Sequence, residues 1–201
     1  MPTLTAEQLE RTASRLLQKA GASQEDAGIA ARHCIGANLA GHDSHGVIRV
    51  PSYIDNIKYG DTVPDADMEI VRETQTTTVV NGNWGLGQVI SEKVMQTTID
   101  KARHSSVAAA TVFQQAHVGR LPDYPVMAAK AGMIALMTAD SGRGPKSVVP
   151  FGGRKPRLGT NPLCIAMPSD LEGPFFIDIA TSAVAGGKIA VAVARDNSVP
   201  E

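Results

Sequence analysis

The chain has 201 residues, of which 43% are hydrophobic, enough for one sizeable core and a small second lobe. Its 19 basic and 20 acidic residues give a formal net charge of -1, so no broad positive field attracts nucleic acid or anionic lipid. The sequence shows neither a targeting segment nor an apolar run that spans a bilayer. We therefore expect a cytoplasmic protein that binds neither nucleic acid nor a membrane.

The first 60 residues predict three helices. A capping-box pattern at Thr5 opens an amphipathic stretch that stops at Gly21. A second helical pattern covers residues 23–41, with acidic residues in its first turn, and these two stretches predict an antiparallel hairpin. A third, shorter helix is expected over residues 47–59, with Pro51 in its first turn.

Helical and strand patterns alternate in the rest of the chain. We expect strands over residues 68–71, 76–80, 107–113, 133–138, 163–167 and 175–179. We expect helices over residues 88–103, 124–131 and 182–194. The fold class is therefore α/β (α+β), with an N-terminal helical lobe over residues 1–66 and an α/β domain over residues 67–201.

Titratable side chains gather at the corner before the third expected helix. The corner reads Asp43-Ser44-His45-Gly46, and on a helix starting near Gly46 the side chains of Arg49 and Tyr53 share one face. A guanidinium, an imidazole and a phenol suit a small carboxylate substrate that exchanges a proton. A helix cap beside a surface salt bridge explains the same spacing.

His117 follows an apolar strand directly, at a place where functional groups often project from an α/β layer. Taken alone, it equally suits a hydrogen-bonded loop histidine. His42 and His45 have the spacing of metal ligands, with His33 upstream, and a metal-dependent hydrolase is one alternative. No further ligand lies at a usual spacing, and Cys34 and Cys164 are read as buried thiols, so we expect no metal.

Glycine-rich segments give weaker signals. Residues 82–87 have the wrong glycine order for a dinucleotide fingerprint, and residues 186–188 lack the other residues of a P-loop. At residues 178–182 a strand passes into a helix that Thr181 or Ser182 is placed to cap, which would leave amide donors for a phosphate or ribose. An ordinary helix cap is the alternative.

Five motifs, taken in order, resemble the malate/L-lactate dehydrogenase family. They are Asp43-Ser44-His45-Gly46 with Arg49 and Tyr53, His117-Val118-Gly119, Pro150-Phe151-Gly152-Gly153, Gly159-Thr160-Asn161-Pro162, and Asp178-Ile179-Ala180-Thr181-Ser182 with Gly187-Lys188. The resemblance implies a nicotinamide-binding domain on a mixed, largely antiparallel sheet, not a Rossmann domain. It also implies hydride transfer between NAD or NADP and C2 of a small 2-hydroxy or 2-oxo acid, by a homodimer in the full-length form.

The same resemblance assigns roles to individual residues. The expected catalytic residues are His45, His117, Arg49 and Tyr53, with either histidine as the proton-transfer group. The expected substrate-binding residues are Ser44, Arg49, Tyr53, Thr160 and Asn161. The expected cofactor-binding residues are Ser141, Ile177, Asp178, Ile179, Ala180, Thr181, Ser182 and Lys188.

Members of the family extend well past the length of this sequence. The resemblance therefore implies a C-terminally truncated chain. If nothing follows Glu201, we expect exposed apolar faces and an unstable or inactive product. The alternative to an enzyme is an inactive remnant that binds nucleotide or a full-length homologue.

Overall fold

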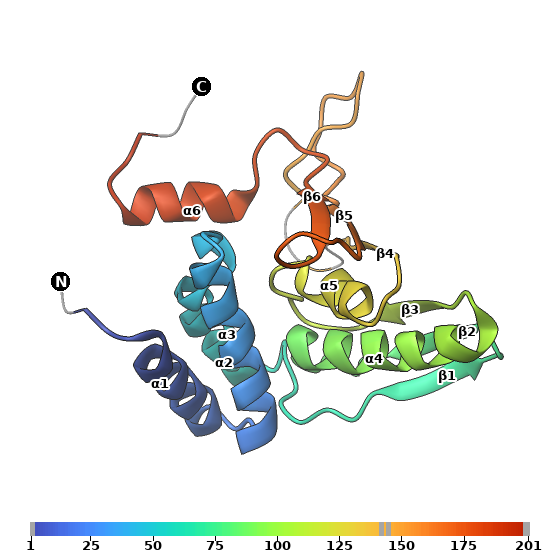
Figure 1. Ribbon diagram of the computed structural model, residues 1–201. Helices are drawn as coiled ribbons and strands as arrows, with labels where there is room; N and C mark the ends of the chain where they lie inside the picture. Colours follow the sequence, from blue (N-terminus) through green and yellow to red (C-terminus); the bar gives the residue numbers. More distant parts are fainter. Residues whose placement is uncertain (1–2, 141–142, 144–145, 199–201) are drawn as a thin grey trace. The chain divides into compact units, whose positions relative to one another are not determined.

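Three helices pack together in the first part of the chain (Figure 1). The computed structural model describes residues 3–140, 143 and 146–198. Helix α1 (Ala6–Lys19) begins at the expected capping box, in which Thr5 and Gln8 each bond the backbone N–H of the other. Helix α2 (Gln24–Leu39) is capped by the Ser23 side chain. Small buried residues on both helices let them approach closely; they include Ala13, Ala27, Ala30, Ala31 and Cys34.

The third helical segment is not one continuous α-helix. Two short 3-10 turns, Asp43–His45 and Val47–Arg49, precede α3 (Val50–Lys58). Pro51 lies in the first turn of α3, as expected, and it has no N–H to bond the Val47 carbonyl. That carbonyl instead accepts a tighter bond from Val50 N–H, so the α-helical bonding begins later than expected.

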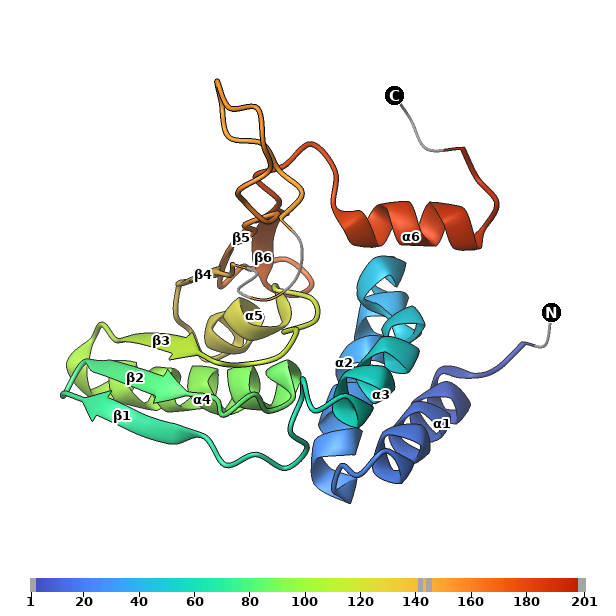
Figure 2. The same cartoon turned by 180° about the vertical axis from the view of Figure 1, so that it is seen from behind.

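A mixed three-stranded sheet follows, with the order β1-β2-β3. Strand β1 (Glu69–Glu73) pairs antiparallel with β2 (Thr77–Asn81), and β2 pairs parallel with β3 (Ala109–Phe113). Helix α4 (Gly87–Ser105) connects β2 to β3 and runs along one face of the sheet (Figures 1 and 2). Val80 and Val112 are partners in the β2–β3 register, and Val80 forms a buried core with Ile90 and Val94 of α4, against which Val112 packs.

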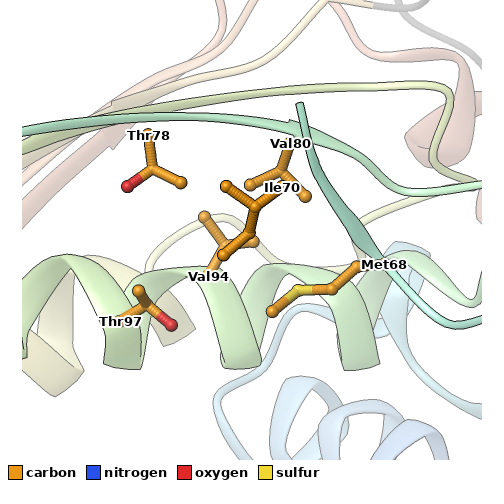
Figure 3. A pocket seen from close by; sticks show the side chains of 6 residues that line it. All are labelled: Met68, Ile70, Thr78, Val80, Val94 and Thr97. Carbon is orange, nitrogen blue, oxygen red and sulfur yellow. The ribbon is translucent and has the colours of Figure 1, made fainter. Parts of the chain in front are cut away.

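A small apolar hollow lies between this sheet and α4. Figure 3 shows Thr78 and Val80 of β2 facing Val94 and Thr97 of α4. The hollow is too small for water, and none of its lining residues is charged. It is therefore a packing defect of the core and offers no chemistry to a substrate.

The second sheet is antiparallel throughout and has the order β4-β5-β6. Its strands are β4 (Ala135–Thr138), β5 (Leu163–Met167) and β6 (Phe175–Ile179). Helix α5 (Asp123–Lys130) packs on β4 and β5, over the buried Cys164 and Ala166. Both sheets agree with the expected fold class, because antiparallel pairing predominates and the described residues form no doubly wound parallel sheet.

The last helix differs from the expectation. Helix α6 covers Gly186–Ala194, four residues later than the predicted start at Ser182. Neither predicted capping side chain reaches it, because Thr181 bonds backbone oxygens near residue 160 and Ser182 bonds the Val184 carbonyl. Ala185 occupies the capping position without a side-chain bond, so the predicted cap is wrong.

The chain divides into two compact units after Arg120, whereas the sequence suggested a boundary at residues 66 and 67. The difference arises because Leu86, just before α4, and Val89 of α4 pack into the helical core, among the same buried residues as Leu17 and Tyr53. The first sheet and the N-terminal helices therefore form one unit. No described helix has the length and hydrophobicity needed to cross a membrane.

An ion cluster joins α2 to α4 inside this first unit. Arg32 Nη2 donates to both carboxylate oxygens of Glu92, at 2.9 and 2.8 Å, and His33 Nε2 lies 2.9 Å from Glu92 Oε2. Burial alone would raise the pKa of Glu92, but the hydrogen bond from His33 and the charge of Arg32 outweigh it and hold that pKa below its usual range.

The substitution Glu92→Gln is expected to lower the free energy of unfolding by about 1–3 kcal/mol near neutral pH, because both partners lose a charged acceptor. A carboxyl whose pKa is lowered by folding stabilises the protein above its unfolded pKa of about 4.3 and loses that contribution as pH falls. Urea unfolding at about pH 7 and about pH 3 should therefore show the difference from wild type shrinking in acid. Glu7→Gln, at an exposed ion pair, is the matched control, and a difference independent of pH would contradict the prediction.

Candidate active site

The corner that carries His45 is fixed by a side chain of α2. Asn38 Nδ2 donates to Asp43 Oδ1 at 2.6 Å, and Asn38 Oδ1 accepts from Val47 N–H at 2.9 Å. Gly46 lies directly against the Asn38 side chain, where any Cβ would collide with the amide. Glycine at this position therefore lets the corner close onto α2, which sets the place of His45.

The ring of His45 is oriented by its neighbours. Ser44 is buried, and its Oγ lies 3.0 Å from His45 Nδ1. The ring of His42 meets that of His45 edge-on, with 4.5 Å between the ring centroids. Ser44, expected to bind substrate, thus contacts His45, one of the two histidines expected to transfer the proton.

Tyr53 projects from α3 into the core, where its side chain is 4% exposed. Its hydroxyl lies 2.8 Å from His117 Nδ1 and accepts from Gln88 Nε2 at 2.9 Å. Burial raises the pKa of Tyr53, and the nearby Arg49 and Gln88 offset this only in part. Tyr53 is therefore a neutral phenol at physiological pH.

Arg49 is half-buried and lies close enough to Tyr53 and His117 to lower the pKa of both. Its Nε is buried and has no hydrogen-bond partner among the described residues. Arg49 also forms no ion pair within the described part of the chain, so the surface salt bridge considered from the spacing is not present. This guanidinium can therefore bind an anionic ligand.

The loop that carries His117 is held by the glycine-rich segment 82–87. Backbone bonds join Gly82 N–H to the Phe113 carbonyl, Trp84 N–H to the Gln114 carbonyl and Ala116 N–H to the Gly85 carbonyl. At Gly87, a Cβ would collide with the backbone of Ala116 and His117. This segment, which has no phosphate-loop motif, instead seats the histidine loop against the start of α4.

These elements bring together the four predicted catalytic side chains. The rings of His45 and His117 are stacked, with centroids 5.5 Å apart and planes 23° apart. Burial and the charges of Arg49 and His45 lower the pKa of His117 to about 3. His117 is therefore neutral at physiological pH, and a neutral imidazole offers one donor and one acceptor.

A metal site is not supported by the geometry. No group of three or more His, Cys, Asp or Glu side chains within residues 3–140, 143 and 146–198 is arranged to hold a metal ion. His33, one of the three histidines considered, bonds Glu92 instead.

Comparison with known proteins shows the family of the chain. Residues 4–201 match the family described as malate/L-lactate dehydrogenase. The chain belongs to the malate/L-lactate dehydrogenase family. It is 35% identical to L-sulfolactate dehydrogenase of Methanothermobacter thermautotrophicus, over 98% of this chain and 57% of the relative. It is 37% identical to malate dehydrogenase of Pyrococcus abyssi, over 93% of this chain and 51% of the relative.

The fold of the family is also confirmed by a solved structure. Malate dehydrogenase from Entamoeba histolytica superposes with a TM-score of 0.93 at 34% identity, covering 99% of this chain and 55% of that one. The chain thus spans little more than half the length of the family members that it matches.

Some of the residues predicted from the family resemblance lie in the second unit and form a group of their own. Thr181 donates through its N–H and its Oγ1 to the Thr160 carbonyl, and its Oγ1 also reaches the Asn161 carbonyl. Asn161 has a φ of +41°, and its Oδ1 is buried with no partner among the described residues. The turn at residues 159–162 is therefore joined to the end of β6.

The remaining predicted cofactor residues are only partly placed. Ile177, Asp178 and Ile179 lie on β6, where Asp178 pairs with Cys164 across the sheet. Ala180 follows the strand, and Lys188 is exposed in the first turn of α6. Ser141 lies outside the described residues. Their role in binding a cofactor stays a prediction.

Two contributors to the site were not predicted from the sequence. Gln88 bonds Tyr53, and Asn38 fixes the corner before His45. Gln88 had one visible signal, because it is a polar residue between Gly87 and the apolar Val89 in the first turn of a helix. Asn38 had none, since an asparagine near the end of a helix is commonplace.

Proposed function

We propose that this protein transfers a hydride between NAD or NADP and C2 of a small 2-hydroxy or 2-oxo acid. The observation that carries the proposal is the meeting of Arg49, Tyr53, His45 and His117 from four separate segments of the first unit. Membership of the malate/L-lactate dehydrogenase family supports the same reaction class.

Arg49 binds the substrate carboxylate. A guanidinium forms paired hydrogen bonds with a carboxylate, and Arg49 has a buried Nε without a partner among the described residues. Its positive charge lies close enough to Tyr53 and His117 to lower the pKa of both, and His117 stacks on His45. Arg49 thus anchors the substrate so that its C2 oxygen faces a histidine.

The histidines handle the proton at the C2 oxygen. Reduction of a 2-oxo acid adds a proton to that oxygen, and oxidation of the 2-hydroxy acid removes it. His45 and His117 are the groups in the cluster that can hydrogen-bond an oxygen and exchange its proton. Tyr53, a neutral phenol, orients the His117 ring through the 2.8 Å bond to Nδ1.

One buried polar atom of the second unit, Asn161 Oδ1, suits a nicotinamide cofactor. The buried Asn161 Oδ1 needs a hydrogen-bond donor, which a carboxamide or a ribose hydroxyl supplies, and Thr181 fixes this turn beside the end of β6. We therefore propose that this part of the second unit, Thr160, Asn161 and residues 177–182, contributes to ligand binding. When bound, the nicotinamide ring supplies or accepts the hydride at C2.

A direct assay tests the proposal. The absorbance of NADH and of NADPH is followed with pyruvate, oxaloacetate and sulfopyruvate, and with succinate as a dicarboxylate control that has no 2-oxo group. We expect turnover with at least one 2-oxo acid and none with succinate. Binding of reduced nucleotide without any turnover would contradict the proposal and favour a non-catalytic nucleotide-binding protein.

A further inference from the structure

Gln88 has an unusual environment for a glutamine. It lies in the first turn of α4, and its side chain is 1% exposed. Nε2 donates to the Tyr53 hydroxyl at 2.9 Å, while Oε1 is buried without a hydrogen-bond partner among the described residues. A buried unsatisfied oxygen costs free energy, and a leucine or methionine would fill the same space without that cost. Packing alone therefore does not account for Gln88.

A backbone group indicates the direction of the hydrogen bonds that run from Gln88 to His117. Gly119 has a φ of +74°, which favours glycine, and its N–H points at His117 Nδ1 with an N···N distance of 3.3 Å. A backbone N–H only donates, so Nδ1 of His117 is an acceptor. The proton of the neutral imidazole is therefore on Nε2.

The other bonds follow from this assignment. Because Nδ1 accepts, the Tyr53 hydroxyl must donate its hydrogen to it across 2.8 Å. The phenol oxygen is then free to act as the acceptor, and Gln88 Nε2–H occupies it. The bond donated by Gln88 and the bond donated by Gly119 therefore favour the same tautomer of His117.

We propose that Gln88 is a positioning residue: by donating to Tyr53 it directs the phenol hydrogen to His117 Nδ1, so that His117 presents Nε2–H to the C2 oxygen of the substrate. The proposal rests on the function proposed above. In this arrangement His117 is a hydrogen-bond donor to a 2-oxo group. No described residue is bonded to Nε2, which leaves that nitrogen for the substrate.

The tautomer of His117 can be observed without substrate. Nitrogen NMR of protein labelled with 15N-histidine distinguishes protonated from unprotonated ring nitrogens, and His117→Asn assigns the signals. At about pH 7, where His117 is neutral, we expect an unprotonated Nδ1 and a protonated Nε2 in the wild type. A wild-type protein with the proton on Nδ1 would overturn the proposal.

Two substitutions at Gln88 test its part in this arrangement. In Gln88→Glu, the carboxylate accepts the Tyr53 hydrogen, so the phenol oxygen accepts from Nδ1–H and the signals move toward the opposite tautomer. Gln88→Met keeps the volume and removes the donor, which should leave a mixture of tautomers. Gln96→Met makes the same change at an exposed position of α4 and should leave the signals unchanged.

Activity provides the second measurement. We expect kcat to fall about 10-fold in Gln88→Met and on the order of 10²-fold in Gln88→Glu, with KM changed less than about threefold because Arg49 remains. Wild-type signals in both variants would overturn the proposal, and Gln88→Met decides alone if Gln88→Glu does not fold. Absence of turnover in the wild type would reject the proposed function, whereas the tautomer result would stand.

Discussion

Replacing Arg49 with methionine is expected to lower kcat/KM for a 2-oxo acid by about 10²–10³-fold, because the substrate carboxylate loses its charged, paired donor. The loss should appear mainly as a higher KM, since the carboxylate is bound in both the ground state and the transition state. Arg49→Lys keeps the charge but not the planar pair of donors, so it should recover only part of the activity.

The pKa of His117 reports the loss of Arg49 without any substrate. The charge of Arg49 is one cause of the low pKa of His117, so Arg49→Met should raise that pKa toward its ordinary value. A histidine titration followed by NMR measures the shift. Arg11→Met, at an exposed site on α1, is the matched control for loss of one arginine. An unchanged KM in Arg49→Met would contradict the assignment of the carboxylate site.

Substitution of the two stacked histidines should separate their roles. His117→Asn and His45→Asn are each expected to lower kcat by about 10²–10⁴-fold if the lost ring exchanges the proton, and by less if it only orients the substrate. His104→Asn, at an exposed position near the end of α4, is the matched control. Wild-type kcat in both variants would remove the basis of the proposed chemistry.

The effect of losing His117 on kcat should not depend on pH. Because the pKa of His117 is lowered to about 3, its ring is neutral throughout the range from about pH 5 to about pH 9. Loss of His117 should therefore lower kcat by the same factor across that range. A factor that changes near pH 6.5, the ordinary histidine value, would show that His117 titrates there and would contradict the burial argument.

Local sequence patterns predicted most of the elements, because helix and strand periodicities are set by which side chains face a core. The capping box at Thr5 and the buried thiols Cys34 and Cys164 agree with the structure. The start of α6 was missed because Thr181 and Ser182, both good capping residues, bond other oxygens. Competition of this kind between partners is not visible in a local pattern.

The reactive side chains of the candidate site could be predicted from the sequence, but the residues that hold them in place could not. His45, Arg49 and Tyr53 are neighbours along the chain, and the family motifs added His117 to the same group. Gln88 and Asn38 act only through tertiary contacts, so no spacing rule indicates them. The division after Arg120 was equally hidden, because it depends on α4 packing against the N-terminal helices.

Because Gly87 has no side chain, the loop that carries His117 packs directly against the start of α4. The backbone of Ala116 and His117 lies where a Cβ would be, and Ala116 N–H is bonded to the Gly85 carbonyl just before the helix. We therefore expect the loop and the start of the helix to open together in one local unfolding step. The amide hydrogen of Ala116 should consequently exchange with deuterated solvent as slowly as those in the first turns of α4, although it belongs to a loop.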